Sequence, residues 1–128
     1  MQGEKILVVS YDRALLRTRM MLLCSSGYAV LMADNIAAVR ETCRKTALNL
    51  AIIGHSIPRQ HQAELVGMVR QECPGVPILL ILKSELEDRP VDVEYIVNAQ
   101  DGPGVLLNMV NSILRPQERV SSTPEPVI

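Results

Sequence analysis

The sequence predicts an α/β protein with a doubly wound, five-stranded parallel sheet. Short apolar runs alternate along the chain with segments whose apolar residues recur at helical spacing. Such alternation is typical of a parallel sheet with helices on both faces. Most of the runs are apolar without interruption, as expected of strands that are buried on both faces. Gly and Pro residues separate several of the segments, which favours turns at those places.

The first strand and helix are expected between Lys5 and Gly27. Residues 5–10, KILVVS, are apolar enough for a central strand. Asp12 stands where a helix N-cap belongs, because its carboxylate can accept a backbone N–H. Gly27 is expected to end the helix, since glycine adopts the left-handed conformation without strain. The buried side of the helix is predicted to carry Leu15, Leu16, Met20, Leu22 and Leu23.

The second and third strands flank a second helix. Residues 28–33, YAVLMA, predict the second strand, and either Asp34 or Asn35 can cap the helix that follows. The stretch LAIIGHSIPRQ, residues 50–60, opens with an apolar run that predicts the third strand. The buried stripe of the second helix is predicted to consist of Ile36, Val39, Cys43 and Ala47.

The third helix and the fourth strand are expected after Pro58. The segment AELVGMVRQEC places Val66, Val69 and Cys73 at helical spacing. The loop CPGVP then leads into PILLIL, residues 77–82, which predict a fourth buried strand.

The connection from the fourth strand to the fifth is short and polar. In KSELEDRP, Pro90 limits a helix to about two turns, so the fourth helix of the fold is expected to be shortened or missing. Residues 91–97, VDVEYIV, predict the fifth strand, and its charges at Asp92 and Glu94 favour an edge position.

A final helix is marked by Leu106, by Met109 or Val110, and by Ile113. Residues 1–115 are therefore predicted to form one domain. Residues 116–128, which contain three prolines and two serines, predict a disordered tail.

These elements predict the flavodoxin-like strand order 2-1-3-4-5. Right-handed crossovers leave few other orders. In this one, ligands bind where strands 1 and 3 diverge, beyond their carboxyl ends. The sequence places Ser10, Tyr11, Asp12, Gly54, His55 and Ser56 at that crevice.

Composition argues against several classes of function. The chain has 13 basic and 14 acidic residues and a net charge of -1, with no block of either sign. No binding surface for nucleic acid or for anionic membranes is therefore expected. The apolar run near the N-terminus is too short for a signal peptide, and no run approaches the roughly 20 residues of a membrane span. We therefore expect a cytoplasmic protein.

No metal or cofactor is expected. Cys24, Cys43 and Cys73 lie far apart and are not close in sequence to His55 or His61, so zinc binding is disfavoured. The three thiols are expected to be small buried side chains in a reducing compartment. The first loop, SYDRALLR, lacks the Gly-rich, hydroxyl-rich turn that would hold the phosphate of FMN.

Short motifs spread over residues 4–115 match one family of proteins. They are KILVV in the first strand, GYAV in the second, Ala33 with Ala38 and Val39, LNLAII with Pro58, Glu64-Leu65 with Val69-Arg70, and VPILLIL. Through these motifs together, the chain resembles the receiver domains of response regulators in two-component signalling, the CheY-like family.

The resemblance implies a particular chemistry. Receivers of this family phosphorylate themselves on an Asp at the end of the third strand. Two carboxylates after the first strand hold Mg²⁺ together with that Asp, because Mg²⁺ prefers oxygen ligands. The metal and a Lys after the fifth strand neutralise the phosphoryl oxygens. A Ser or Thr after the fourth strand hydrogen-bonds the bound phosphoryl group.

Each of these positions departs from the family's pattern. The acidic pair falls on Ser10 and Tyr11, and the phosphoacceptor falls on Gly54. The Ser or Thr falls on Leu82, and the Lys falls on Asn98. The chain therefore resembles a receiver whose phosphorylation pocket is degenerate.

Two further positions anchor this alignment. Pro58 lies four residues after Gly54, as the family's proline lies after its acceptor, and Tyr95 lies three before Asn98, where the family often has its switch aromatic. The stretch from Leu82 to Asn98 is about six residues shorter than the family implies. A fifth strand with less helical cover would allow a homodimer.

Several functional interpretations compete with structural ones. His55 could accept a phosphoryl group, although a solvent-facing loop histidine is favoured. Ser10 with His55 could form a nucleophile and base, but no third group orients the histidine. Asp12 could be a remaining metal ligand, although a helix cap is favoured. Tyr95 could act as a switch, but Leu82 offers no hydroxyl to it.

The sequence therefore predicts an atypical receiver in two-component, or phosphorelay, signal transduction. It is expected to be neither phosphorylated nor an enzyme and to act by protein-protein interaction, with a histidine kinase or a downstream regulator as partner. The alternative is a regulatory domain that binds a small molecule or effector in the crevice at the ends of strands 1 and 3, where His55 and Ser56 could contact the ligand.

Overall fold

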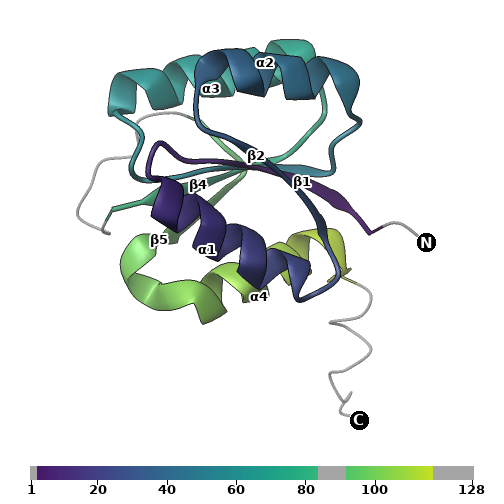
Figure 1. Ribbon diagram of the computed structural model, residues 1–128, viewed down its shortest axis with the longest axis vertical. Coiled ribbons are helices and arrows are strands. Elements are labelled where there is room, and N and C mark those ends of the chain that lie inside the picture. The colour runs from purple at the N-terminus through teal and green to yellow at the C-terminus, as the bar shows by residue number, and fades with distance from the viewer. Residues whose placement is uncertain (1–2, 84–91, 117–128) are drawn as a thin grey trace, which may run out of the picture.

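The computed structural model describes residues 3–83 and 92–116. It has a parallel sheet sandwiched between two layers of helices (Figure 1). The strands are β1 (Lys5–Val9), β2 (Ala29–Ala33), β3 (Leu50–Ile53), β4 (Ile78–Leu82) and β5 (Tyr95–Asn98). The helices are α1 (Arg13–Cys24), α2 (Ile36–Lys45), α3 (Arg59–Glu72), the short 3-10 helix η1 (Ala99–Asp101) and α4 (Gly102–Leu114).

The strand order is β2-β1-β3-β4-β5, and all neighbouring strands are parallel. The predicted order 2-1-3-4-5 is therefore confirmed. Parallel pairing brings the carboxyl ends of the strands to one edge of the sheet. The register sets Val9 beside Ile53 and Leu82 beside Asn98 at that edge.

Each face of the sheet has its own hydrophobic core. Figure 1 shows α2 and α3 on one face and α1 and α4 on the other. Alternate residues of the central strands supply the two cores, as the pleat of a strand requires. Leu7, Ile53 and Leu80 pack toward α2 and α3, whereas Ile52 and Ile81 pack toward α1 and α4. The uninterrupted apolar runs are explained by this burial on both faces.

Most of the predicted helix boundaries agree with the structure. Asp12 caps α1, because its carboxylate accepts hydrogen bonds from the N–H groups of Ala14 and Leu15. Of the two candidate caps for α2, Asn35 makes the bond, to the N–H of Ala38. Gly27 has a φ of 93°, the left-handed conformation that was predicted for it.

Three details of the sequence prediction were wrong. Ala47 is exposed and follows the end of α2, so it is not part of the buried stripe. Cys24 is exposed, although Cys43 and Cys73 are buried as predicted. Asp92 and Glu94 lie before β5 and not within it, and the Glu94 carboxylate accepts hydrogen bonds from Arg70 and from the N–H of Ile78.

Two predictions fall largely on residues that the structure does not describe. The shortened or missing fourth helix was predicted for residues 83–90, and the disordered tail for residues 116–128. Residues 84–91 and 117–128 lie outside the described ranges. Among the described residues, no helix is long and apolar enough to cross a membrane.

The end of α4 is fastened to the start of the chain. The Arg115 guanidinium donates to both carboxylate oxygens of Glu4, at 3.0 and 3.2 Å. The same guanidinium lies 4.1 Å from the centre of the Tyr28 ring, a distance typical of a cation-π contact. The Tyr28 hydroxyl donates to the Asn111 side chain. These contacts hold α4 against the amino ends of β1 and β2.

Candidate functional site

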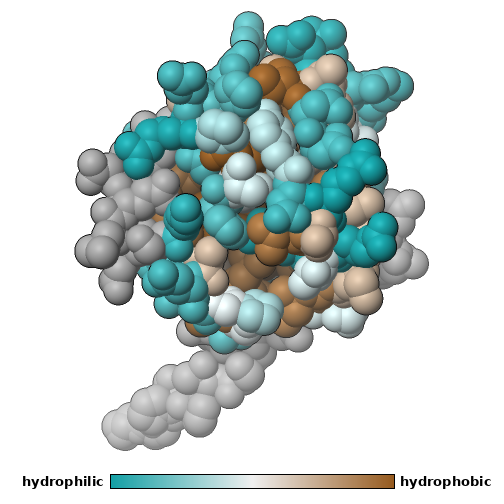
Figure 2. Space-filling view, turned by 60° about the vertical axis from the view of Figure 1, so that its left-hand side comes forward, coloured by the Kyte–Doolittle hydropathy of each residue, from teal (hydrophilic) through white to brown (hydrophobic). Residues whose placement is uncertain are grey.

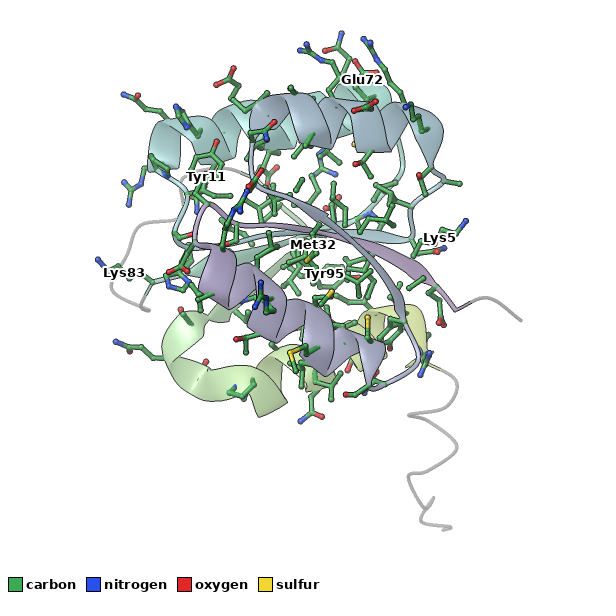
Figure 3. The ribbon with its side chains drawn as sticks, viewed as in Figure 1. Lys5, Tyr11, Met32, Glu72, Lys83 and Tyr95 are labelled. Atoms are coloured by element: carbon green, nitrogen blue, oxygen red, sulfur yellow. The ribbon has the colours of Figure 1, made fainter. Side chains whose placement is uncertain are left out.

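The strand ends bring the predicted site residues to one edge of the sheet. Ser10 follows β1, Gly54 follows β3, and Leu82 and Asn98 are the last residues of β4 and β5. Gly54 donates its N–H to the Val9 carbonyl at 2.9 Å, which holds the ends of β1 and β3 together. Figure 3 shows Tyr11 and Lys83 at this end of the molecule and Lys5 at the opposite end.

Two serines join the loops that follow β1 and β3. The hydroxyls of Ser10 and Ser56 lie 2.9 Å apart, and Ser10 is fully buried. Ser56 Oγ also accepts from the N–H of Tyr11, while Ser10 Oγ contacts both the N–H and the carbonyl of Asp12. All contacts are satisfied when Ser56 donates to Ser10 and Ser10 donates to the Asp12 carbonyl. These hydroxyls therefore hold two loops together.

Tyr11 and Asp12 serve the local structure as well. The Tyr11 hydroxyl lies 3.2 Å from Nδ1 of His61 on α3, and the two rings pack edge to face with centroids 5.8 Å apart. Burial raises the pKa of Tyr11, and the negative charge of Glu64 adds to this shift. Asp12 is exposed and caps α1, as described above.

An arginine from α1 fills the place of a side chain at position 54. A Cβ atom built on Gly54 would lie only 2.7 Å from Nη1 of Arg19 and 3.1 Å from the Val9 carbonyl oxygen. Such distances are shorter than van der Waals contact, so the guanidinium and a side chain at position 54 compete for one space. Only 8% of Arg19 is exposed. A buried positive charge therefore lies at the end of β3.

The Arg19 guanidinium has little compensation from the described residues. Its Nη2 contacts Nδ1 of His55 at 3.2 Å, and its Nη1 is buried without a hydrogen-bond partner. Burial lowers the pKa of Arg19, and the negative charge of Asp12 partly opposes this shift. Arginine nevertheless stays charged in proteins. Because it donates to Nδ1, the ring proton of a neutral His55 belongs on Nε2.

A cavity of about 180 Å³ lies beside this arginine, between α1 and α4. Its polar lining includes Arg19, His55 and Asn98, and most of the remaining wall is apolar. Figure 2 shows hydrophobic residues gathered in the lower half of the face that it displays, surrounded by hydrophilic side chains. His55 is half-buried in the loop after β3 and lines this cavity, so it is less exposed than the predicted solvent-facing loop histidine.

Leu82 and Tyr95 belong to different cores. Leu82 is buried in the core beneath α2 and α3, whereas Tyr95 packs against the core beneath α1 and α4. Tyr95 is half-buried on β5, as the favoured interpretation of the sequence required.

The structure does not pair Ser10 with His55 in the way that a hydrolase would need. Ser10 bonds to Ser56 and to the Asp12 backbone, and His55 Nδ1 bonds to Arg19. A base that activates a serine must lie within hydrogen-bonding reach of its hydroxyl. The described hydrogen bonds of Ser10 are thus all structural.

Metal-binding groups do not gather in the part of the chain that the structure describes, where no cluster of three or more His, Cys, Asp or Glu side chains occurs. The buried thiols of Cys43 and Cys73 are neighbours, since Cys73 Sγ lies 3.4 Å from the Cys43 carbonyl oxygen. Burial raises the pKa of Cys43 to about 12, and its contact with Cys73 adds to the shift. A thiol that stays protonated is a poor metal ligand and nucleophile.

Sequence reasoning missed Arg19. The signal was present, because Arg19 lies three residues after Leu16 and four before Leu23, within the apolar stripe of α1. An arginine at such a position is ordinarily expected to extend to solvent. Here the missing side chain of Gly54 leaves room for the guanidinium at the end of β3.

Comparison with known proteins places this geometry in context. No protein-family model matches the chain. Over 90 residues, 70% of the chain, it is 28% identical to the response regulator protein FleR of Pseudomonas aeruginosa. The chain spans only about a fifth of the length of that relative, since the match covers 19% of FleR.

Solved structures with the same fold are numerous. The chemotaxis response regulator CheY4 of Vibrio cholerae superposes with a TM-score of 0.75 at 20% identity, covering 88% of this chain and 100% of CheY4. A CheY-like receiver domain protein from Methanospirillum hungatei gives 0.77 at 20% identity, with 92% and 98% covered. The receiver domain of the hybrid histidine kinase CckA gives 0.70 at 22% identity, with 87% and 99% covered. The chain therefore has the CheY-like receiver fold.

Proposed function

We propose that this chain is a receiver-like module of two-component signalling that is not phosphorylated and that acts by binding other proteins. The receiver fold and the likeness to FleR support the signalling role. The replaced residues of the pocket support the loss of phosphorylation. Regulation would then come from binding of a partner or from the amount of protein.

The observation that carries this proposal is the Arg19 guanidinium against Gly54. Phosphorylation of a receiver requires a carboxylate nucleophile and a bound Mg²⁺ at the end of the third strand. In this chain a glycine occupies the acceptor position, and a buried cation stands where the acceptor's side chain would begin. Since like charges repel, this cation disfavours Mg²⁺ at the same place.

The other replaced positions point the same way. Ser10 and Tyr11 provide no carboxylate for a metal, and the Ser10 hydroxyl is already bonded within the protein. Leu82 has no hydroxyl to contact a phosphoryl group. Asn98 is neutral, so it cannot neutralise phosphoryl oxygens as a lysine does. Mutation of one position alone is thus not expected to restore the reaction.

The proposed partners are those with which receivers work, namely a histidine kinase or a downstream regulator. A homodimer through the edge of the sheet at β5 is a further candidate. The likeness to the CckA receiver domain is compatible with a kinase partner. The proposed module makes no covalent change to its partner and is not an enzyme.

Incubation with acetyl phosphate and Mg²⁺, followed by intact-mass measurement, tests the loss of phosphorylation. We expect the mass to stay unchanged while a receiver that retains its Asp, treated in parallel, gains one phosphoryl group. A stoichiometric phosphoryl adduct on this chain would contradict the proposal, and peptide mapping would identify the acceptor. An adduct on His55 would revive the histidine-acceptor alternative.

The second candidate function is small-molecule binding. The place that best supports it is not the predicted crevice between β1 and β3. Ser10 and Ser56, at the predicted crevice between β1 and β3, are already hydrogen-bonded to each other. The cavity beside Arg19, between α1 and α4, is the better candidate. His55 is the one residue of the predicted crevice ligands that also lines this cavity.

A further inference from the structure

Among the described residues, no carboxylate forms a hydrogen bond or an ion pair with the buried Arg19 guanidinium, and Asp12 acts on it only at longer range. The described hydrogen bond of the guanidinium goes to Nδ1 of the His55 ring, and an imidazole that accepts this bond carries no negative charge. The nearby Asp12 carboxylate is bonded to the first turn of α1 and makes no described bond to the guanidinium. An uncompensated buried charge is costly, so an anion that reaches Arg19 would be strongly favoured.

The cavity between α1 and α4 leads to Arg19, and its walls limit the size and shape of an anion that would bind there. Arg19 and Asn98 supply polar groups at the end near the sheet edge. The side chains of Leu15, Leu22 and Leu106 form apolar walls. A cavity of about 180 Å³ is close to the roughly 150 Å³ of an engineered cavity that binds benzene. It is too small for a nucleotide or for most drug-sized molecules.

We propose that this cavity binds a small organic carboxylate, with its carboxylate paired to the Arg19 guanidinium and its apolar body between α1 and α4. A carboxylate forms a strong, charge-assisted hydrogen bond with a guanidinium N–H, here on the side of the group away from the buried Nη1. Inorganic phosphate would compensate the charge of Arg19 but would make no apolar contact with the leucine side chains of the cavity. A neutral molecule of the same shape fills the walls but leaves the charge uncompensated.

This inference does not depend on the proposed signalling role. The acetyl phosphate experiment can fail while the carboxylate site remains, and the reverse also holds. The two proposals share only the observation that the Arg19 guanidinium lies where a side chain at position 54 would begin. Binding of a carboxylate at this place would also give a partner-binding module a chemical input.

The test uses the full chain and four probes in calorimetric and NMR titrations. Benzoate and isovalerate are the carboxylates, benzamide is the neutral isostere of benzoate, and inorganic phosphate is the anion without an apolar body. We expect saturable binding of benzoate or isovalerate that is at least about tenfold tighter than binding of benzamide or phosphate. Benzamide carries no negative charge to pair with Arg19, and phosphate has no apolar body to fill the cavity. Equal binding of benzamide or of phosphate would overturn the proposal, as would the absence of saturable binding by both carboxylates.

Two variants test the location of the site. Arg19→Met removes the guanidinium but keeps a long apolar side chain, and we expect it to weaken benzoate binding at least about tenfold. Arg17→Met removes an exposed charge from the same helix and should leave binding within about twofold, as expected of a screened surface charge. Equal losses in both variants would overturn the proposal, because they would indicate non-specific attraction.

A second substitution keeps the test decisive if Arg19→Met perturbs the fold. Ala99→Leu adds bulk to the cavity wall without altering the charge. We expect this variant to keep its amide spectrum outside the cavity and to lose benzoate binding. Undiminished binding in a folded Ala99→Leu protein would place the ligand elsewhere and would refute the assignment to this cavity.

Discussion

Nη1 of Arg19 lies where the side chain of residue 54 would begin. A Cβ atom at Gly54 would be 2.7 Å from this nitrogen, although the two residues stand on different elements, α1 and the end of β3. The contact places a buried positive charge at the carboxyl end of β3. Under the proposed alignment with receivers, this is the edge of the sheet where they carry acidic groups that attract a divalent cation.

Removal of the Arg19 charge should not harm the fold. The guanidinium is buried and Nη1 has no partner, and replacement of such charges by apolar groups is often neutral or stabilising. We expect Arg19→Met to raise the free energy of unfolding by about 1 kcal/mol, measured by urea denaturation. Arg17→Met is the matched control and should change it by less than about 0.5 kcal/mol. A loss of stability in Arg19→Met alone would show that the charge is well compensated.

Gly54→Ala should destabilise the protein, mainly through Arg19. The added methyl group must displace the guanidinium and crowd the Val9 carbonyl oxygen, so we expect a cost of about 1–3 kcal/mol in the free energy of unfolding. In the Arg19→Met background the cost should fall by at least about 0.5 kcal/mol, because residues in contact are coupled. A double-mutant cycle by denaturation measures this coupling. Strict additivity would contradict the contact between the two residues.

Gly54→Asp should restore the acceptor's carboxylate without restoring phosphorylation. The new carboxylate would lie against Arg19 and pair with it, while the carboxylates that hold Mg²⁺ would still be missing. We expect no phosphoryl adduct after treatment with acetyl phosphate and Mg²⁺, as measured by intact mass. The Gly54→Asn variant has the same shape without the charge and should be less stable than Gly54→Asp. Phosphorylation of Gly54→Asp would show that the other replaced positions do not prevent the reaction.

The contact of Glu4 with Arg115 should make stability depend on pH. The Arg115 hydrogen bond lowers the pKa of Glu4 in the folded state, although burial opposes the shift. A lowered folded pKa stabilises the protein above the ordinary value of 4.5, and this contribution is lost as the pH falls through the folded pKa. Glu4→Gln should therefore lower the free energy of unfolding at neutral pH, by about 0.5–1 kcal/mol for a partly exposed pair. The difference from the wild type should vanish in acid.

A matched control for that pH series is Glu41→Gln. Glu41 pairs with Lys45 one turn away, but both side chains are more than half exposed. Solvent screens such a pair, so this variant should follow the wild-type curve at every pH. If Glu4→Gln also follows it, then Arg115 does not fasten α4 through Glu4.

Local rules accounted for much of the fold. Asp12 and Asn35 cap helices because their side-chain oxygens can reach nearby N–H groups, and Gly27 takes the left-handed conformation that other residues avoid. These are short-range effects that neighbouring sequence letters reveal. The strand order followed from the alternation of strands and helices together with the preference for right-handed crossovers.

The site was harder to predict because its contacts join distant parts of the chain. The Ser10–Ser56 bond spans 46 residues and the Arg19–His55 bond spans 36, and no local pattern predicts either one. The sequence analysis did not single out Arg19, although it stands in an apolar stripe. The absence of a side chain at Gly54 gave it a place in the interior, and that effect depends on packing alone.

A magnesium titration observed in the amide NMR spectrum tests the reversed charge of the pocket most directly. The amides of Ser10, Gly54 and Asn98 report on the edge where a receiver would bind the metal. We predict no saturable shift of these amides at millimolar Mg²⁺, in the wild type or in Gly54→Asp. A saturable shift confined to them in the wild-type protein would show a metal site beside Arg19, and it would contradict the proposal that a buried cation takes the place of the acidic pocket.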